Sequence, residues 1–116
     1  VRRDTLEKTE VSLEKVIEEI RKLLSEIQEN MYLRARWRRD EMTKTVTSFE
    51  EMKHLAETEN GFIRAVWCGK RECEEKIKEE TGITSRCIPF NEEFKGGKCI
   101  YCGEEATKLV YWGKQY

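Results

Sequence analysis

The sequence predicts an α+β fold in which a long N-terminal helix and short helices pack on a small antiparallel sheet that four cysteines hold together. Apolar residues recur every three or four positions between Leu13 and Met31, which is the stripe of an amphipathic helix. The segment Phe62–Trp67 is short, apolar and rich in residues that favour strands. Four of the five cysteines fall in two closely spaced pairs in the C-terminal half.

The long helix is expected to run from Ser12, a plausible N-cap, to Arg39. A span of about 28 residues is ~42 Å long at 1.5 Å per residue, which is more than the core of so small a protein needs. We therefore expect this helix to brace the domain against another one or to form an oligomer seam. The seven-residue repeat is too short to favour a coiled coil.

The second half alternates short helices with strands. Ser48 and Glu51 form a capping box that predicts a second helix, which ends near Gly61. A third helix is predicted from Glu72 to Thr81, where Gly82 stops it. The predicted strands are residues 62–67, 84–90 and 107–112.

The paired cysteines have the spacing of a metal site. Cys68 and Cys73 form a C-x4-C pair, and Cys99 and Cys102 form a C-x2-C pair that Gly103 follows. A C-x2-C turn aims two sulfurs at one point, and four thiolates suit a closed, structural Zn²⁺ site. Such a site has no open coordination position, so we expect the metal to hold structure without performing chemistry.

Two other interpretations of the cysteines are weaker. A disulfide framework predicts an even count in a secreted chain, whereas this chain has five cysteines and no apolar signal segment at its start. An iron–sulfur cluster usually draws three thiolates from one compact run, which is missing here. The fifth cysteine, Cys87, is expected to be a small core residue in the strand of residues 84–90.

Composition and charge restrict the classes of protein to which the chain can belong. The chain has 116 residues, of which 39% are charged and 38% apolar. Its apolar core is therefore small, and we expect a cross-link such as a bound metal ion to contribute to its stability. The net charge of −1 gives no general attraction to nucleic acid. No apolar run approaches the ~20 residues of a membrane-spanning helix, so no membrane partner is expected. Reduced cysteines indicate a cytoplasmic protein.

Several blocks of this sequence are informative together: residues 61–69 (GFIRAVWCG), 73–82 (CEEKIKEETG) and 86–90 (RCIPF), the Cys99/Cys102 knuckle and a chain end at Tyr116. Together they resemble the C-terminal domain of archaeal/eukaryal-type prolyl-tRNA synthetases. Their order and spacing are specific, although a single C-x2-C would not be. The resemblance implies a cytoplasmic, homodimeric parent enzyme that attaches L-proline to tRNA(Pro), using ATP and Mg²⁺ to form a prolyl-adenylate.

The resemblance also assigns roles to residues of this chain. It implies that Cys68, Cys73, Cys99 and Cys102 bind the zinc, and that the carboxylate of Tyr116 supports the active site of the parent. The catalytic motifs of the family lie upstream of this region, so the chain alone is not expected to aminoacylate. The expected partners are the catalytic and anticodon-binding domains of the parent and, through the parent, tRNA(Pro).

The resemblance divides the chain into three parts. Residues 1–11 are expected to be a remnant of the anticodon-binding domain, in which residues 2–4 resemble a last strand; residues 12–47 form the connecting helix and residues 48–116 the zinc-binding domain. The first residue is Val1, which makes the chain look like a fragment. Arg34 and Arg38 share a helix face and could contact tRNA, although a solvated surface is the favoured interpretation.

A second hypothesis from a different class is a free-standing zinc-ribbon-like module that binds RNA or protein. It would account for the four cysteines and the small size without any parent enzyme. The missing initiator methionine and the strand-like residues 1–4 favour the first hypothesis. His54, the single histidine, has no acid or base partner nearby in sequence, and Trp67 and Trp112 are assigned to the small core.

Overall fold

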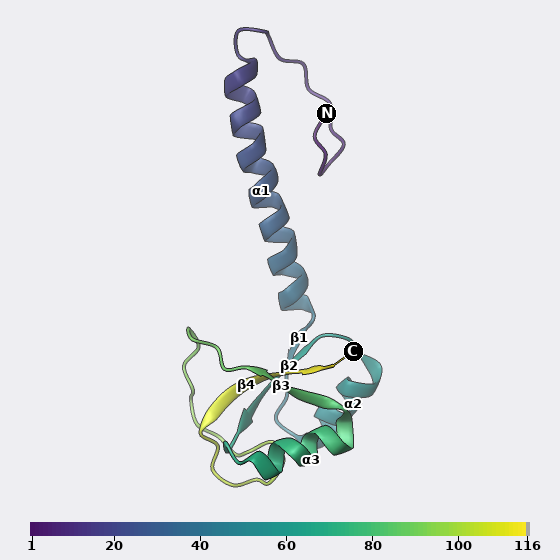
Figure 1. The fold of residues 1–116 in the computed structure, drawn as a ribbon, viewed down its shortest axis with the longest axis vertical. Coiled ribbons are helices and arrows are strands. Elements are labelled where there is room, and N and C mark those ends of the chain that lie inside the picture. The colour runs from purple at the N-terminus through teal and green to yellow at the C-terminus, as the bar shows by residue number, and fades with distance from the viewer. Residues whose placement is uncertain (116) are drawn as a thin grey trace. The chain divides into compact units, whose positions relative to one another are not determined.

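A computed structural model describes residues 1–115, which form three helices and one sheet (Figure 1). The elements in chain order are α1 (Val16–Glu41), β1 (Thr43–Thr45), α2 (Phe49–Thr58), β2 (Phe62–Trp67), α3 (Arg71–Thr81), β3 (Ile83–Cys87) and β4 (Lys108–Lys114). The chain divides into two compact units. The first is Val1–Asp40, and the second begins at Glu41.

Helix α1 begins four residues later than predicted and ends two residues later. Ser12 does not cap it; the Ser12 carbonyl accepts a hydrogen bond from the Lys15 amide in a turn that precedes the helix. Glu18 and Glu19 lie in the first turn and Arg38 and Arg39 in the last, which complements the helix dipole. None of its residues is buried against the part of the chain that the structure describes.

The segment before α1 forms a turn, and the strand expected for residues 2–4 is not present in this described region. The Leu6 amide donates to the Arg2 carbonyl (2.9 Å) and the Arg2 amide to the Glu7 carbonyl (2.8 Å). These bonds occupy the amides of Arg2 and Leu6 and the carbonyls of Arg2 and Glu7 within the segment itself. The strand prediction was therefore wrong for this structure.

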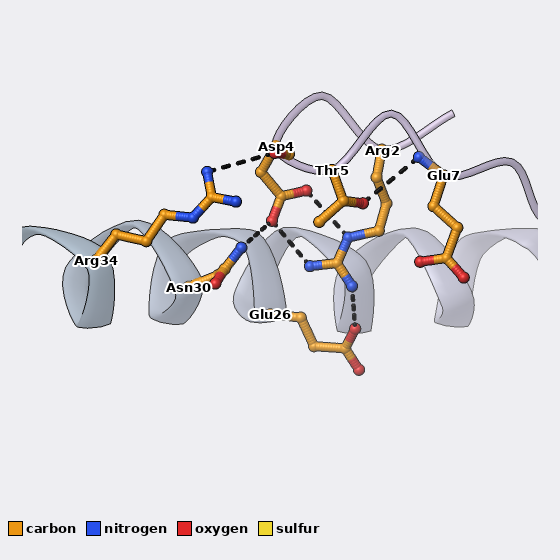
Figure 2. A network of polar contacts seen from close by, with 7 residues as sticks. All are labelled: Arg2, Asp4, Thr5, Glu7, Glu26, Asn30 and Arg34. Carbon is orange, nitrogen blue, oxygen red and sulfur yellow. Dashed lines mark hydrogen bonds and ion pairs between the residues drawn. The ribbon is translucent and has the colours of Figure 1, made fainter.

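Asp4 anchors this turn on α1, as Figure 2 shows. Its carboxylate accepts hydrogen bonds from Arg2 Nε (3.0 Å) and Asn30 Nδ2 (2.7 Å), and its side chain is 5% exposed. Arg34 donates to the Asp4 carbonyl at 3.4 Å. The hydrogen bonds from Arg2 and Asn30 hold the pKa of the Asp4 carboxyl well below its usual range.

Replacing Asp4 by Asn should release the N-terminal turn from α1. Because the folded pKa of Asp4 is lowered, its contribution to stability is present above the unfolded pKa of ~3.9 and is lost as the pH falls toward the folded value. The Leu6 amide, which is hydrogen-bonded within the turn, reports on this stability. In Asp4→Asn its hydrogen exchange should be faster than in the parent sequence, and its protection should no longer fall as Asp4 is protonated at low pH.

Asp40→Asn is the matched control for Asp4→Asn. Asp40 lies at the other end of α1 and is 56% exposed in its ion pair with Arg39. Its substitution should leave Leu6 exchange unchanged. Equal Leu6 protection in Asp4→Asn and in the parent sequence would show that the carboxylate does not hold the turn.

The sheet has the strand order β1-β2-β4-β3 and is mixed, not antiparallel as predicted. Strand β1, which the sequence patterns did not reveal, pairs in parallel with β2 through Thr43–Phe62 to Thr45–Arg64. Helix α2 connects the two strands, and a crossover helix is the usual link between parallel neighbours. The pairs β2–β4 and β3–β4 are antiparallel, as expected.

The local signals for α2 and α3 are confirmed. The Glu51 amide donates to Ser48 Oγ at 3.3 Å, while the Glu51 carboxylate accepts from the Thr47 amide, one residue before the position that the capping box predicts. Helix α3 ends at Gly82, whose φ of +71° places it in the left-handed region that favours glycine.

Strand β3 is displaced from its prediction and leaves Cys87 exposed. It spans Ile83–Cys87, and the pairing with β4 shifts between Ser85 and Cys87. A bulge of this kind re-aims the side chains that follow it, so Cys87 leaves the buried side and Ile88 and Phe90 continue as exposed loop. The assignment of Cys87 to the core was therefore wrong.

The core of the second unit lies between the sheet and helices α2 and α3, which lie against each other (Figure 1). Trp112 of β4 is completely buried and meets Trp67 edge to face at 6.1 Å, as expected for two core residues. The buried cluster comprises Val46, Met52, Ala56, Ile63, Ala65, Ile77, Ile83, Ile100, Val110 and Trp112.

Candidate metal centre

The four paired cysteines converge on one point, as their spacing predicted. Cys68 follows β2, Cys73 lies in the first turn of α3, and Cys99 and Cys102 lie in the loop before β4. Their sulfur atoms all lie within 4.8 Å of one another, and Cys73 and Cys99 are buried. The turn after β2, the first turn of α3 and the loop before β4 therefore each contribute to one cluster of thiols.

Backbone and side-chain hydrogen bonds shape the arm that carries Cys68. Thr107 donates its hydroxyl to the Cys68 carbonyl (3.1 Å) and its amide to the Trp67 carbonyl (2.9 Å). Trp67 Nε1 donates to the Lys70 carbonyl at 3.2 Å. Gly69, with φ of +86°, lets the chain turn between the strand and α3.

The C-x2-C knuckle is fixed by its own backbone. The Gly103 amide donates to the Cys99 carbonyl (3.0 Å), and the Cys99 amide donates to the Glu104 carbonyl (2.7 Å). The Ile100 amide donates to the Val66 carbonyl of β2 at 3.0 Å. The two arms are thus joined by protein hydrogen bonds, which pre-organises the thiols for a ligand.

The thiols differ in their acidity. Burial raises the pKa of the Cys68 and Cys73 thiols. Burial also acts to raise the pKa of Cys99, but the backbone N–H groups of Cys102, Tyr101 and Cys68 outweigh it and lower the pKa to about 7. Cys99 is therefore the thiol of these three that ionises most readily, and ionised thiolates are what bind metal.

A salt bridge links the two arms that carry the cysteines. Lys70, in the loop of the first arm, pairs with Glu104, just beyond the knuckle, and so bridges the two arms. The hydrogen bond to Glu104 raises the pKa of Lys70, and the nearby Cys102 and Cys68 contribute to the rise. Because the pair as a whole is neutral, its contribution at this place is the link between the two arms.

The geometry fits a tetrahedral thiolate site. Four Zn–S bonds of ~2.3 Å place the sulfurs ~3.8 Å apart at the corners of a tetrahedron. The Cys68–Cys73 and Cys68–Cys102 sulfur distances are 3.6 and 3.8 Å. The donor set is entirely sulfur, which is the preference of soft metal ions, and four protein ligands would leave no open position for catalysis.

Among the described residues, no other residue singled out in the sequence is a member of this cluster. His54 lies on α2 and its carbonyl accepts from the Thr58 hydroxyl, as in ordinary helical packing. Arg34 and Arg38 both belong to α1, and Arg34 is engaged with Asp4. Tyr116 lies outside the described residues.

The comparisons with known proteins agree with this arrangement. A family model described as "Prolyl-tRNA synthetase, C-terminal" matches residues 49–116, which include all four clustered cysteines. The chain belongs to this family. No member of the cysteine cluster falls outside the matched region.

Relatives and solved structures extend the prolyl-tRNA synthetase match over the rest of the chain. "Proline--tRNA ligase 2" of Bacillus thuringiensis (strain Al Hakam) is 52% identical and "Proline--tRNA ligase" of Clostridium novyi (strain NT) 51%, each over 116 residues that are 100% of this chain and 24% of the relative. A prolyl-tRNA synthetase from Cryptosporidium parvum, crystallised with halofuginone and AMPPNP, is 31% identical with a TM-score of 0.91, and the match covers 98% of this chain and 24% of that one.

This chain therefore spans about a quarter of the length of the prolyl-tRNA ligases that it matches. No helix that the structure describes combines the length and apolar character needed to cross a membrane.

Sequence reasoning missed the residues that hold the arms of the candidate site together. Thr107, the Lys70–Glu104 pair and Tyr101 all act through contacts between segments far apart in the chain. Tyr101 had one available signal, because it lies between the two knuckle cysteines. The others carry no local pattern that distinguishes them from surface residues.

Proposed function

We propose that this chain is the C-terminal part of a prolyl-tRNA synthetase that attaches L-proline to tRNA(Pro) and uses ATP and Mg²⁺ to form prolyl-adenylate. The observation that carries the proposal is the match of residues 49–116 to the family model, with named proline–tRNA ligases aligned over the whole chain. Catalysis is assigned to the part of the parent outside this chain. The role of this part is stability and positioning.

We propose Zn²⁺ as the ion of the cysteine cluster and Cys68, Cys73, Cys99 and Cys102 as its ligands. When bound, the ion supplies a cross-link between the two arms and no reactive position. The all-sulfur donor set and the spacing of the sulfurs support this choice. The positions of the two arms are set by protein contacts, which come from Thr107, Gly103 and the Lys70–Glu104 pair.

We further propose the division of the chain into parts of the parent. Residues 1–11 are assigned to the anticodon-binding domain, residues 12–47 to the connecting helix and residues 48–116 to the zinc-binding domain. Exposed apolar side chains on and just before α1 support a brace that packs against another part of a cytoplasmic, homodimeric parent. These side chains are Leu13, Ile17, Ile20, Leu24 and Met31.

Three residues receive roles only within the parent. Tyr116 is proposed to support the active site by positioning. Arg34 and Arg38 are proposed as minor contacts to the tRNA backbone, with Arg34 partly committed to Asp4. The alternative of a free-standing zinc-ribbon module is not favoured, because the relatives match this chain as a quarter of a longer enzyme.

The test compares two cysteine variants in the full-length parent. Cys102→Ser should lower the zinc content and reduce the rate of tRNA prolylation at least several-fold, because the knuckle loses one of its two ligands. Zinc is measured by elemental analysis and prolylation with labelled proline and tRNA(Pro).

Cys87→Ser is the matched control, since Cys87 is exposed and outside the cluster. It should keep both zinc and prolylation. A parent without proline-dependent activity would contradict the proposed enzyme, and full zinc in Cys102→Ser would contradict the proposed ligands.

A further inference from the structure

Both residues between the knuckle cysteines are anchored to other elements. Ile100 is 6% exposed and belongs to the buried core, and its amide is bonded to β2. Tyr101 extends in the direction of α2 and α3, which it contacts through its ring and its hydroxyl. The loop that presents Cys99 and Cys102 is therefore fastened at each position between them.

Tyr101 closes a four-membered cluster with residues of two helices. Its ring meets Phe49 edge to face, with centroids 5.0 Å apart, and its hydroxyl donates to Glu80 at 3.0 Å. Glu80 pairs with Lys53 at 2.8 Å, and the Lys53 ammonium lies 4.7 Å from the centre of the Phe49 ring. Each member contacts the next, so displacing one side chain alters the contacts of the other three.

The cluster connects the knuckle to the first turns of α2. Phe49 is the first residue of α2 and Lys53 lies one turn later, so both belong to one helix face. Glu80 lies near the end of α3. The contact between Tyr101 and Phe49 joins positions 52 residues apart in sequence, so it links the knuckle to α2 through space and not along the chain.

We propose that Tyr101 couples metal occupancy of the cysteine cluster to the order of α2. A metal that fixes the spacing of Cys99 and Cys102 fixes the residues between them, and the Tyr101 ring then restrains Phe49 and, through Glu80, Lys53. By thermodynamic reciprocity, a change that loosens α2 from Tyr101 also weakens the hold on the metal. This inference rests on the proposed metal site, and it adds a route from that site to a helix that carries no ligand.

Tyr111 provides a closely matched comparison within the same chain. It also meets a phenylalanine edge to face (Phe62, 6.5 Å) and donates its hydroxyl to a glutamate (Glu92, 2.6 Å). In this cluster the cation, Arg64, lies 5.6 Å from the centre of the tyrosine ring itself, not over the phenylalanine. Tyr111 belongs to β4 and is not part of the knuckle. Truncating each tyrosine therefore removes an edge-to-face ring contact and a hydroxyl bond to a glutamate, and at Tyr111 the contact with Arg64 as well. Only Tyr101 lies in the loop between the proposed ligands.

The test uses the 116-residue chain loaded with Co²⁺ as a visible probe of the cluster. In Tyr101→Ala, release of Co²⁺ to an excess of chelator should be on the order of tenfold faster, which is the lower end of the effect of lost outer contacts on metal affinity. Hydrogen exchange of the Met52 and Lys53 amides in the loaded variant should also speed up. Tyr111→Ala should leave both the release rate and these two amides close to the parent values.

The outcomes separate this inference from the metal site itself. If the chain takes up no Co²⁺, the proposed site fails and the coupling fails with it. If Co²⁺ binds fully but Tyr101→Ala and Tyr111→Ala release it at the same rate, the site stands and the coupling is overturned. Tyr101→Phe, which keeps the ring and loses only the bond to Glu80, should give an intermediate rate; a rate equal to that of the alanine variant would mean that the ring contact with Phe49 contributes nothing.

Discussion

Removing the metal from this chain is expected to unfold the unit that begins at Glu41 while α1 stays partly helical. The core of this unit is small, and the segment between β3 and β4, which carries Cys99 and Cys102, has no helix or strand of its own among the described residues. Structural zinc contributes about 10–16 kcal/mol in small peptides, whereas whole domains are stable by only about 5–15 kcal/mol. The free energy of metal binding is therefore at least as large as the stability that a domain of this kind holds.

Cys99→Ser should reproduce the effect of a chelator. Cys99 is 3% exposed and accepts backbone N–H groups at its sulfur, so a serine there loses a ligand at the most enclosed position. Far-ultraviolet circular dichroism should show partial loss of helix, and the β2 and β4 amides should exchange freely. The α1 amides should keep their protection, because nearly all of α1 belongs to the other unit.

Cys87→Ser serves as the control for Cys99→Ser, because Cys87 is exposed and follows the irregularity in the pairing of β3 with β4. It should leave metal content and folding unchanged. A well-folded preparation that contains no metal would contradict the expected dependence of folding on the ion. Unfolding of Cys87→Ser would show that cysteine loss acts by some route other than ligation.

Truncating Trp112 should be the most damaging change in the apolar core. Trp112 is completely buried in β4, pairs with Ile63 across the sheet and meets Trp67 at 6.1 Å. Trp→Ala at such a site removes buried surface and leaves a cavity, which together cost about 3–5 kcal/mol. Chemical denaturation of the metal-loaded chain should show a loss of this size in the second unit.

Two further tryptophan variants test the cause of that loss. Trp37 lies on α1 and is 66% exposed, so Trp37→Ala should change stability little. Trp112→Phe keeps most of the buried ring and removes an indole N–H that has no hydrogen-bond partner among the described residues. It should be much milder than Trp112→Ala. Equal losses for Trp112→Phe and Trp112→Ala would show that the cavity does not cause most of the destabilisation.

Local signals in the sequence were sufficient to predict several helices and strands and some of their bounds. The bounds of β2 match the predicted strand, and α3 ends at Gly82 because glycine adopts the left-handed conformation there without strain. Ser48 formed the predicted cap on the Glu51 amide, and the Glu51 carboxylate reached back to the Thr47 amide, one residue before the predicted position. The convergence of the cysteines could also be predicted, since a C-x2-C turn and a strand-to-helix turn each bring two thiols together.

The sequence by itself thus determined the elements whose cause lies within a few neighbouring residues, and it determined the four thiols of the candidate site. Only the tertiary structure decided the parallel pairing of β1, the bulge that exposes Cys87, the turn that Asp4 fastens to α1 and the Tyr101 cluster. Each of these depends on contacts between residues far apart in the chain. Their partners cannot be identified from local patterns, because the same side chains would equally suit a solvated surface.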